Sequence, residues 1–257
     1  PYHKKWEDKG VVSKELWIKA GHAGLLCPNV PENYGGIGGD FRFNIIIAEE
    51  LAKAGVTGPG FAVHSDIVAP YIINYCSEKQ KKYYLPKMIS GEIITAIAMT
   101  EPGTGSDLQN IKTKATISTD TVTLNGSKTF ITNGQNANLV LVVAKTDTSQ
   151  KAKGISIILC EENNKGFKRG KNLEKIGMKA QDTSELYFEE VVLPKENILG
   201  NAGQGFSQLM DELPQERLSI AVTAISAAEA ALNWTIAYVK ERTAFDKKII
   251  EFQNPKF

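Results

Sequence analysis

Residues 97–107 read Ile-Ala-Met-Thr-Glu-Pro-Gly-Thr-Gly-Ser-Asp, and they stand where helical sequence gives way to strand sequence. The apolar run at 93–99 suits a strand. The proline and two glycines at 102–105 then force a turn that exposes Thr100, Ser106 and several backbone N–H groups. The sequence therefore predicts the edge of a strand that opens into a polar loop.

This loop can be interpreted either as a chain reversal or as a ligand loop. Glycines let backbone amides approach a phosphate closely, which favours a nucleotide site. A dinucleotide fingerprint needs Gly-x-Gly-x-x-Gly at the start of a helix, but the ten residues after Asp107 alternate as a strand does. No helix dipole is offered to a phosphate here, and the spacing alone leaves both interpretations open.

The composition bounds the size and the class of the protein. A chain of 257 residues is long enough for two domains or one large domain. Thirty Lys and Arg against 29 Asp and Glu give a net charge of +1, which does not favour a nucleic-acid or membrane-surface protein. Any anionic ligand must therefore be held by local groups.

The cysteines and histidines show no metal-ligand spacing. Cys27, Cys76 and Cys160 lie far apart without a C-x-x-C pair, so we expect buried free thiols in a reducing compartment. The three histidines form no i, i+4 pair, and no metal site is predicted. The apolar stretches are shorter than the roughly 20 residues of a membrane span. The chain starts at Pro1 without a readable targeting segment, and we expect a soluble protein.

Hydrophobic periodicity divides the chain into three parts. Residues 1–95 are predicted to be mainly helical, with Asp40 as an N-cap and Ser77 with Gln80 as a capping box. Residues 96–200 alternate with a period of two, which indicates an antiparallel β-barrel or sandwich. Residues 201–257 return to helical spacing. The predicted fold class is α+β, with a helical N-terminal domain, a middle β-domain and the start of a C-terminal helical bundle.

Three local features carry further expectations. Asn125-Gly126 predicts a tight hairpin, and Asn133-Gly134 predicts a second turn. Pro214 is awkward, because a proline inside a helix costs about 3 kcal/mol or more. The three tryptophans, Trp6, Trp17 and Trp234, are predicted to serve packing only.

The chain resembles the acyl-CoA dehydrogenase family over its whole length. The stretches that carry the resemblance are P-E-N-Y-G-G-I-G-G-D at 31–40, A-M-T-E-P-G-T-G-S-D at 98–107, F-I-T-N-G at 130–134, Q-E-R-L at 215–218 and E-R-T-A-F at 241–245. Within the family it is most similar to the long-chain branch. That likeness rests on G-P-G-F-A-V-H-S at 58–65, K-A-Q-D-T at 179–183 and E-L-P-Q-E-R-L at 212–218.

The resemblance implies that FAD lies between the sheet and the helices. Ile97, Ala98, Met99, Thr100, Gly105 and Ser106 would line the flavin ring and its pyrimidine edge, with Thr100 hydrogen-bonding it. Phe130, Ile131 and Thr132 would lie on the other side of the ring, where the family often has Trp at the position of Phe130. Phenylalanine keeps the stacking surface and loses an N–H donor.

The C-terminal residues imply an oligomer. Arg242, Phe245 and Gln253 match positions that contact the pyrophosphate or adenosine half of the flavin across a subunit interface, so a homodimer or homotetramer is expected. The usual F-G-K of the family is Phe245-Asp246-Lys247 here, and an aspartate beside a diphosphate is electrostatically unfavourable.

The resemblance assigns the catalytic base to Glu216, a position used by the long-chain and isovaleryl branches. Pro214, Gln215, Arg217 and Ser106 would contact the acyl-CoA. Without the family, a Glu followed by Arg on a helix is more often solvated surface. Removing the α-proton of a thioester needs a carboxylate whose basicity rises in a dry pocket, while FAD accepts the β-hydride.

The implied activity is FAD-dependent oxidation of a fatty acyl-CoA in β-oxidation, with longer chains preferred and electron-transfer flavoprotein as the acceptor. The location would be the mitochondrial matrix in a eukaryote or the cytoplasm in a bacterium. The alternatives are an isovaleryl or branched short-chain enzyme, a non-catalytic relative and an oxidase. Because the chain stops at Phe257 inside the expected bundle, these 257 residues alone are predicted to bind flavin poorly and to have negligible activity.

Overall fold

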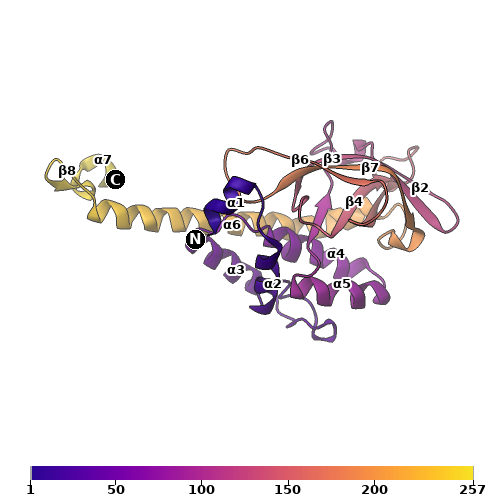
Figure 1. Ribbon diagram of the computed structural model, residues 1–257, viewed down its shortest axis with the longest axis horizontal. Helices are drawn as coiled ribbons and strands as arrows, with labels where there is room; N and C mark the ends of the chain where they lie inside the picture. The colour runs from indigo at the N-terminus through magenta and orange to yellow at the C-terminus, as the bar shows by residue number, and fades with distance from the viewer. Residues whose placement is uncertain (1, 257) are drawn as a thin grey trace.

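A computed structural model describes residues 2–256 and shows helices packed under a curled sheet, with one long helix extending beyond both (Figure 1). Residues 3–90 form the helical part, and the predicted helical N-terminal domain is confirmed. Its elements are α1 (His3–Lys9), α2 (Lys14–His22), α3 (Phe41–Lys53), a π-helix (Val63–Val68) that continues into α4 (Ala69–Tyr75), and α5 (Glu78–Ser90).

The helix boundaries follow the capping residues. Asp40 caps α3 by accepting a hydrogen bond from the Arg42 N–H at 3.0 Å. Ser77 and Gln80 form the predicted capping box of α5, and Gly91, at φ 78°, ends that helix in the left-handed conformation. Ser13 stands at the N-cap position of α2, but its side chain makes no capping bond.

The middle domain is a seven-stranded mixed sheet. The strand order is β1-β4-β2-β3-β7-β6, and β5 pairs with β4. Most pairs are antiparallel as expected, but β1 runs parallel to β4, so the sheet is mixed. The strands are β1 (Thr95–Ala98), β2 (Lys114–Ile117), β3 (Thr121–Thr132), β4 (Leu139–Lys145), β5 (Ile155–Glu161), β6 (Phe167–Asn172) and β7 (Thr183–Pro194).

The hairpin predicted at Asn125-Gly126 is wrong. Strand β3 runs through both residues with a bulge, and Asn125 bonds Glu190 on the neighbouring strand instead of turning the chain. The β2–β3 turn lies earlier, where the Ser118 N–H donates to the Thr121 carbonyl at 2.8 Å. The turn predicted at Asn133-Gly134 is present, with Asn133 at φ 63°.

Two other strand expectations change. The segment after Asp107 begins with a 3₁₀ turn at Leu108–Asn110, and strand β2 starts only at Lys114. Strand β6, Phe-Lys-Arg-Gly-Lys-Asn, was not predicted, because its mostly polar residues give no alternating apolar signal. It adds to the edge of the sheet by pairing with β7.

Strand β4 separates two cores. Its seven residues are all buried, because alternate side chains point to opposite faces of the sheet. Leu139, Leu141 and Val143 pack with the helices, in the cluster that contains Tyr71 and Leu209. The side chains on the other face of β4, which include Val140, pack inside the curl of the sheet. The first cluster is the layer between the sheet and the helices.

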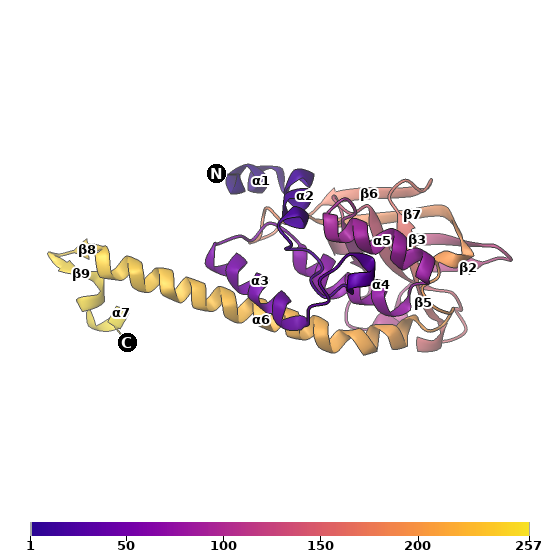
Figure 2. The same ribbon diagram turned by 90° about the horizontal axis from the view of Figure 1, so that it is seen from below.

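Helix α6 (Gly205–Glu241) is 37 residues long and passes under the N-terminal helices, as the turned view shows (Figure 2). It continues through Pro214. Its far end carries the small hairpin β8 (Thr243–Ala244) and β9 (Lys247–Lys248), followed by α7 (Gln253–Lys256). Phe245, at φ 53°, and Asp246, at φ 58°, form the hairpin turn.

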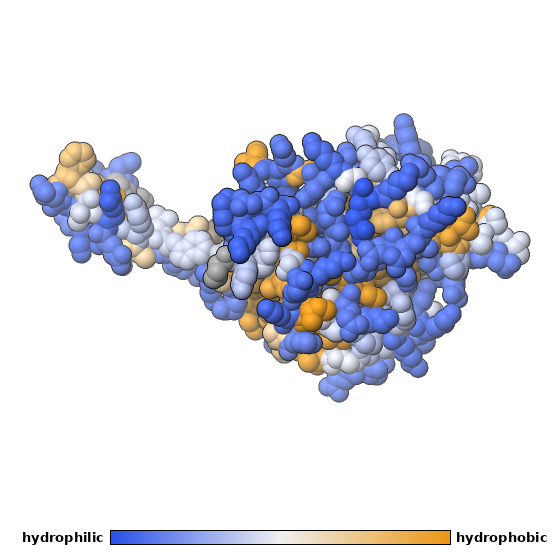
Figure 3. Space-filling view, in the orientation of Figure 1, coloured by the Kyte–Doolittle hydropathy of each residue, from blue (hydrophilic) through white to orange (hydrophobic). Residues whose placement is uncertain are grey.

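Apolar side chains remain exposed along α6 and α3. They gather where α3 and α6 lie side by side (Figure 3), and they include Phe43, Ile46, Leu218, Ile225, Leu232 and Trp234. The predicted packing role holds for Trp17, which is buried, whereas Trp234 is half exposed and lies beside Gly55.

Helix α6 also corrects an expectation about apolar length. Within residues 2–256 it is the helix that is long and apolar enough to cross a membrane, by length and composition alone, and little of its apolar part is buried. The expectation that the apolar stretches are shorter than the roughly 20 residues of a membrane span is therefore wrong for α6. The core helix of a helical bundle has the same composition.

Candidate active site

The loop after β1 is closed by a tight backbone pair. The Glu101 N–H donates to the Thr104 carbonyl at 2.9 Å, and the Thr104 N–H returns a bond to Glu101 at 3.0 Å. Gly105 and Ser106 follow on the exposed side. A Cβ added at Gly103 or Gly105 would meet no atom within 4 Å, so the chain leaves open space beside the loop.

A buried ion pair anchors this loop to β3. The Lys128 ammonium donates to Glu101 Oε1 at 2.9 Å and to the Met99 carbonyl at 2.8 Å, and its side chain is fully buried. Glu101 also accepts from the N–H groups of Lys112 and Thr113. Burial lowers the pKa of Lys128 to about 8, against the opposing effect of the Glu101 charge.

The electrostatics of Glu101 favour its charged form. Burial alone would raise the pKa of Glu101, but the Lys128 charge and the hydrogen bonds from Thr113 and Lys112 outweigh it and lower the pKa. The carboxylate is therefore the stable form. Neither member of this pair was a predicted site residue, because nothing in the polar sequence around Lys128 indicates that its side chain is buried.

Phe130 lies beside the loop on a bulge of β3. The register of β3 shifts between Lys128 and Ile131, and Phe130 adopts φ 58° with 66% of its surface exposed. The Thr129 N–H donates to the Thr100 carbonyl at 2.9 Å, which joins the two segments. The structure thus brings the predicted flavin residues 97–106 and 130–132 together.

The loop after β1 and Phe130 fit a flavin ring, whereas the side chains of Ala98 and Ile131 are buried inside the curl of the sheet. An aromatic face turned outward by a strained backbone stands next to a polar loop with open space beside its glycines. The side chains of Ile97 and Met99 pack on the cluster that contains Tyr71, on the side of the helices. A planar ligand between the sheet and the helices would touch residues that the chain already holds in place.

Glu216 lies on the buried face of α6 and points to α4. It is 9% exposed, and the Tyr71 hydroxyl donates to its Oε1 at 2.8 Å. Burial raises the pKa of Glu216, Glu212 raises it further, and the hydrogen bond from Tyr71 opposes both. A carboxylate in this environment is a stronger base than one in water.

The helix around Glu216 is fixed by a polar network. Buried Asp66, on the π-helix, accepts from the Ser219 hydroxyl and from the Asn44 amide, each at 2.6 Å. The Gln215 amide donates to the Asp66 carbonyl at 2.9 Å. Burial raises the pKa of Asp66. Asp66 therefore holds α6 at Gln215 and Ser219, on either side of Glu216, and is itself held by Asn44 of α3.

The remaining predicted substrate residues are placed around this turn. Gln215 is half-buried and engaged with Asp66, whereas Pro214 and Arg217 lie on the exposed side of α6. Ser106 lies on the loop after β1. Their contact with a thioester stays a prediction.

Arg242, Phe245 and Gln253 lie elsewhere. They follow the far end of α6 (Figure 1), and Phe245 is 90% exposed in the hairpin turn. Within one chain the structure does not bring them to the loop at 97–107. A role of these residues at a second copy of the chain stays a prediction.

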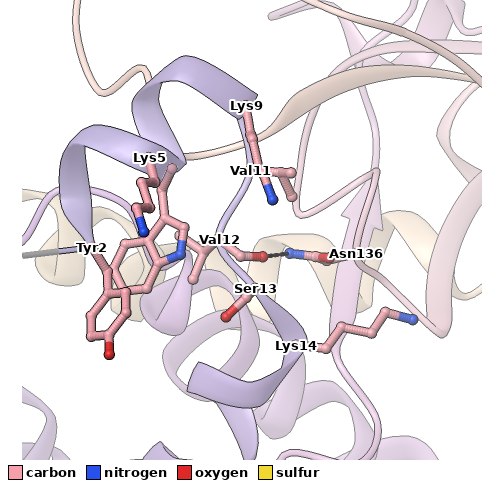
Figure 4. Close-up of a pocket in the computed structure, with 9 residues that line it drawn as sticks. Tyr2, Lys5, Lys9, Val11, Val12, Ser13, Lys14 and Asn136 are labelled. Atoms are coloured by element: carbon pink, nitrogen blue, oxygen red, sulfur yellow. Dashed lines mark hydrogen bonds between the residues drawn. The ribbon is translucent and has the colours of Figure 1, made fainter.

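A cavity of about 350 Å³ lies at a different place, between α1, the start of α2 and the middle domain (Figure 4). The Asn136 amide donates to the Val12 carbonyl at 2.8 Å at its floor. It is lined by Tyr2, Lys5, Trp6, Lys9, Val11, Val12, Ser13, Lys14 and Asn136, none of which was a predicted site residue.

Family models match the chain in three consecutive segments. Residues 1–92 match the N-terminal domain of acyl-CoA dehydrogenase, residues 96–191 its middle domain and residues 203–257 its C-terminal domain.

Similar proteins support the same match. The long-chain specific acyl-CoA dehydrogenase of Sus scrofa is 53% identical over 98% of this chain, which spans 59% of that relative. The crystal structure of an acyl-CoA dehydrogenase from Geobacillus kaustophilus is 48% identical, with a TM-score of 0.95 over 100% of this chain and 68% of that one. A glutaryl-CoA dehydrogenase from Mycobacterium smegmatis in complex with FADH2 is 31% identical, with a TM-score of 0.90, over 100% of this chain and 65% of that one.

Proposed function

Because the chain belongs to the acyl-CoA dehydrogenase family, we propose that the full-length protein binds FAD and oxidises a fatty acyl-CoA to the trans-2-enoyl-CoA. The observation that carries this proposal is the buried Glu216 carboxylate, whose pKa is raised mainly by burial and which α4 holds by a hydrogen bond. A base of this kind suits the removal of a weakly acidic proton next to a thioester carbonyl.

Different residues of this chain would hold FAD and take the proton. Residues 97–100, 105–106 and 130–132 would hold FAD, which supplies the acceptor for the β-hydride when bound. Glu216 takes the α-proton. Its Oε1 already accepts from Tyr71, so Oε2 is the atom left for the proton. Substrate binding excludes water from the turn that carries Glu216, which strengthens the base further.

The substrate class follows from the likeness to the long-chain relative. Long-chain preference in β-oxidation is favoured because the Sus scrofa protein carries that name at 53% identity. An isovaleryl or branched short-chain enzyme is the alternative, since that branch also has its base at this place. We also propose that electron-transfer flavoprotein accepts the electrons and that the protein is a homodimer or homotetramer. We expect no transmembrane segment and, in a eukaryote, a location in the mitochondrial matrix.

Two measurements on the full-length protein test this proposal. Purified protein should show flavin absorbance bands, and turnover with an artificial electron acceptor should be faster on palmitoyl-CoA than on isovaleryl-CoA. The opposite preference would favour the branched-chain alternative. Absence of flavin would favour a non-catalytic relative, and peroxide production in place of acceptor reduction would indicate an oxidase.

A further inference from the structure

We propose that Tyr71 and Glu212 act on Glu216 in opposite directions, Tyr71 as a positioning residue that holds Oε1 and Glu212 as a charge that strengthens the base. The inference rests on the proposed role of Glu216. It extends that role to two residues, one on another helix and one on the previous turn of α6.

Tyr71 is built into the fold as a fixed donor. It has no exposed surface, lies on α4 and packs its ring 6.1 Å from the ring of Tyr75. Burial and the charge of Glu216 raise the pKa of Tyr71, so the phenol stays protonated and always donates. A buried donor that stays protonated orients the carboxylate.

This contact makes the two oxygens of Glu216 unequal. Oε1 accepts from Tyr71 at 2.8 Å, and within residues 2–256 no hydrogen bond is made to Oε2. A proton arriving from substrate therefore goes to Oε2. Without the phenol the carboxylate could rotate about its terminal torsion, which has broad minima.

Glu212 stands one turn before Glu216 on the same face of α6. It is 9% exposed, and the Asn74 amide donates to its Oε1 at 2.8 Å. Like charges four residues apart on a helix repel each other, and burial strengthens that repulsion. Burial, followed by the charge of Glu212, raises the pKa of Tyr75 to about 12.

The other elements packed against this turn add one more acidic group. The titratable groups near this turn are Tyr71 and Tyr75 on α4 and Glu212 on α6 itself. Asp66, on the π-helix, is the additional acidic group. Asp66 is engaged with Ser219 and Asn44 and meets the turn through Gln215. Tyr71 and Glu212 are thus the groups that act on Glu216 directly.

Removing the two contacts should change the proton affinity of Glu216 in opposite directions. Tyr71→Phe removes a donor to the carboxylate, which destabilises the anion and makes Glu216 bind its proton more tightly. Glu212→Gln removes a neighbouring negative charge, which makes Glu216 release its proton more easily. The acidic limb of kcat/KM should move to higher pH in the first variant and to lower pH in the second.

The test uses the full-length, flavin-loaded protein with palmitoyl-CoA. Tyr71→Phe should lower kcat roughly 10- to 100-fold with less than about a threefold change in KM, because orientation of the base is lost. Tyr84→Phe is the matched control, since buried Tyr84 donates to Glu161 Oε1 at the same 2.8 Å. The control should lower the melting temperature to a similar degree and leave the acidic limb in place.

A second readout does not depend on turnover. Because folding raises the pKa of Glu216, the folded state binds more protons than the unfolded state at pH values between the unfolded and the folded pKa. Stability is therefore lost as pH rises through that window. Tyr71→Phe should steepen this loss in melting temperature, Glu212→Gln should reduce it, and adding Glu216→Gln should abolish both differences.

The inference would be overturned if the acidic limbs of Tyr71→Phe and Glu212→Gln move in the same direction or do not move. It would also be overturned if Tyr84→Phe shifts the acidic limb as much as Tyr71→Phe does. Failure of the proposed function is seen separately. If Glu216→Gln keeps normal turnover, Glu216 is not the base, whatever the other variants do.

Discussion

Replacing Lys128 by Met tests whether the buried ion pair holds the loop at 97–107. Methionine has a similar length without the charge, so the change removes the bonds to Glu101 and to the Met99 carbonyl while it fills the same space. Glu101 keeps the backbone N–H donors of Lys112 and Thr113. It becomes a buried carboxylate without a countercharge.

The expected cost follows from burial of the pair. Lys128 is 1% exposed and Glu101 is 7% exposed, with 2.9 Å between Nζ and Oε1. Breaking a buried pair from one side costs about 3–5 kcal/mol. In a domain of this size that lowers the melting temperature by roughly 10 °C. Adding Glu101→Gln to the variant removes the unpaired charge and should restore part of the stability.

Lys168→Met is the matched control for calorimetry. The Lys168–Glu189 pair is shorter, at 2.7 Å, but its side chains are 61% and 64% exposed. An exposed pair contributes about 0–1 kcal/mol, so this variant should melt close to the wild type. Flavin affinity should fall in Lys128→Met only. Equal melting temperatures for the two variants would refute a structural role of the buried pair.

Two further predictions concern the core behind the site. Burial lowers the pKa of His64 from 6.5 to about 4, so its contribution to stability is complete above pH 6.5. About 3 kcal/mol should be lost as the pH falls from 6.5 to 4, and acid unfolding of His64→Gln should lack this slope. Gly60→Ala should lower the melting temperature by several degrees, because its Cβ would stand 2.0 Å from Asn133 Oδ1. An unchanged melting temperature would show that Asn133, whose amide bonds Gly60 and Thr95, can move aside.

Local signals in the sequence predicted the elements whose boundaries depend only on residues close together in the chain. Asp40 and the Ser77–Gln80 pair mark the helix starts, because capping depends on neighbouring residues. Asn125-Gly126 has the composition of a hairpin turn, yet pairing of β3 with β7 and the Asn125 bonds to Glu190 keep the strand continuous. Tertiary pairing outweighed turn chemistry there.

Sequence motifs named the candidate site residues, whose roles stay predictions, but they gave no sign of the contacts that support those residues. Residues 97–106, residues 130–132 and Glu216, which lies in Q-E-R-L at 215–218, could be named as candidates because each belongs to a contiguous motif. Tyr71 lies 145 residues from Glu216, and Lys128 lies 27 from Glu101. No periodicity or spacing in one sequence shows that such residues meet. Their partners become visible only when the helices pack under the sheet.

The most direct test of the central claim is Glu216→Gln in the full-length, flavin-loaded protein. Glutamine keeps the size of the side chain and can still accept from Tyr71 through its oxygen, but it cannot take a proton. Flavin absorbance per chain should be unchanged, and turnover on palmitoyl-CoA should fall at least about 10²- to 10⁴-fold. Near-normal turnover with flavin retained would contradict the assignment of Glu216 as the base.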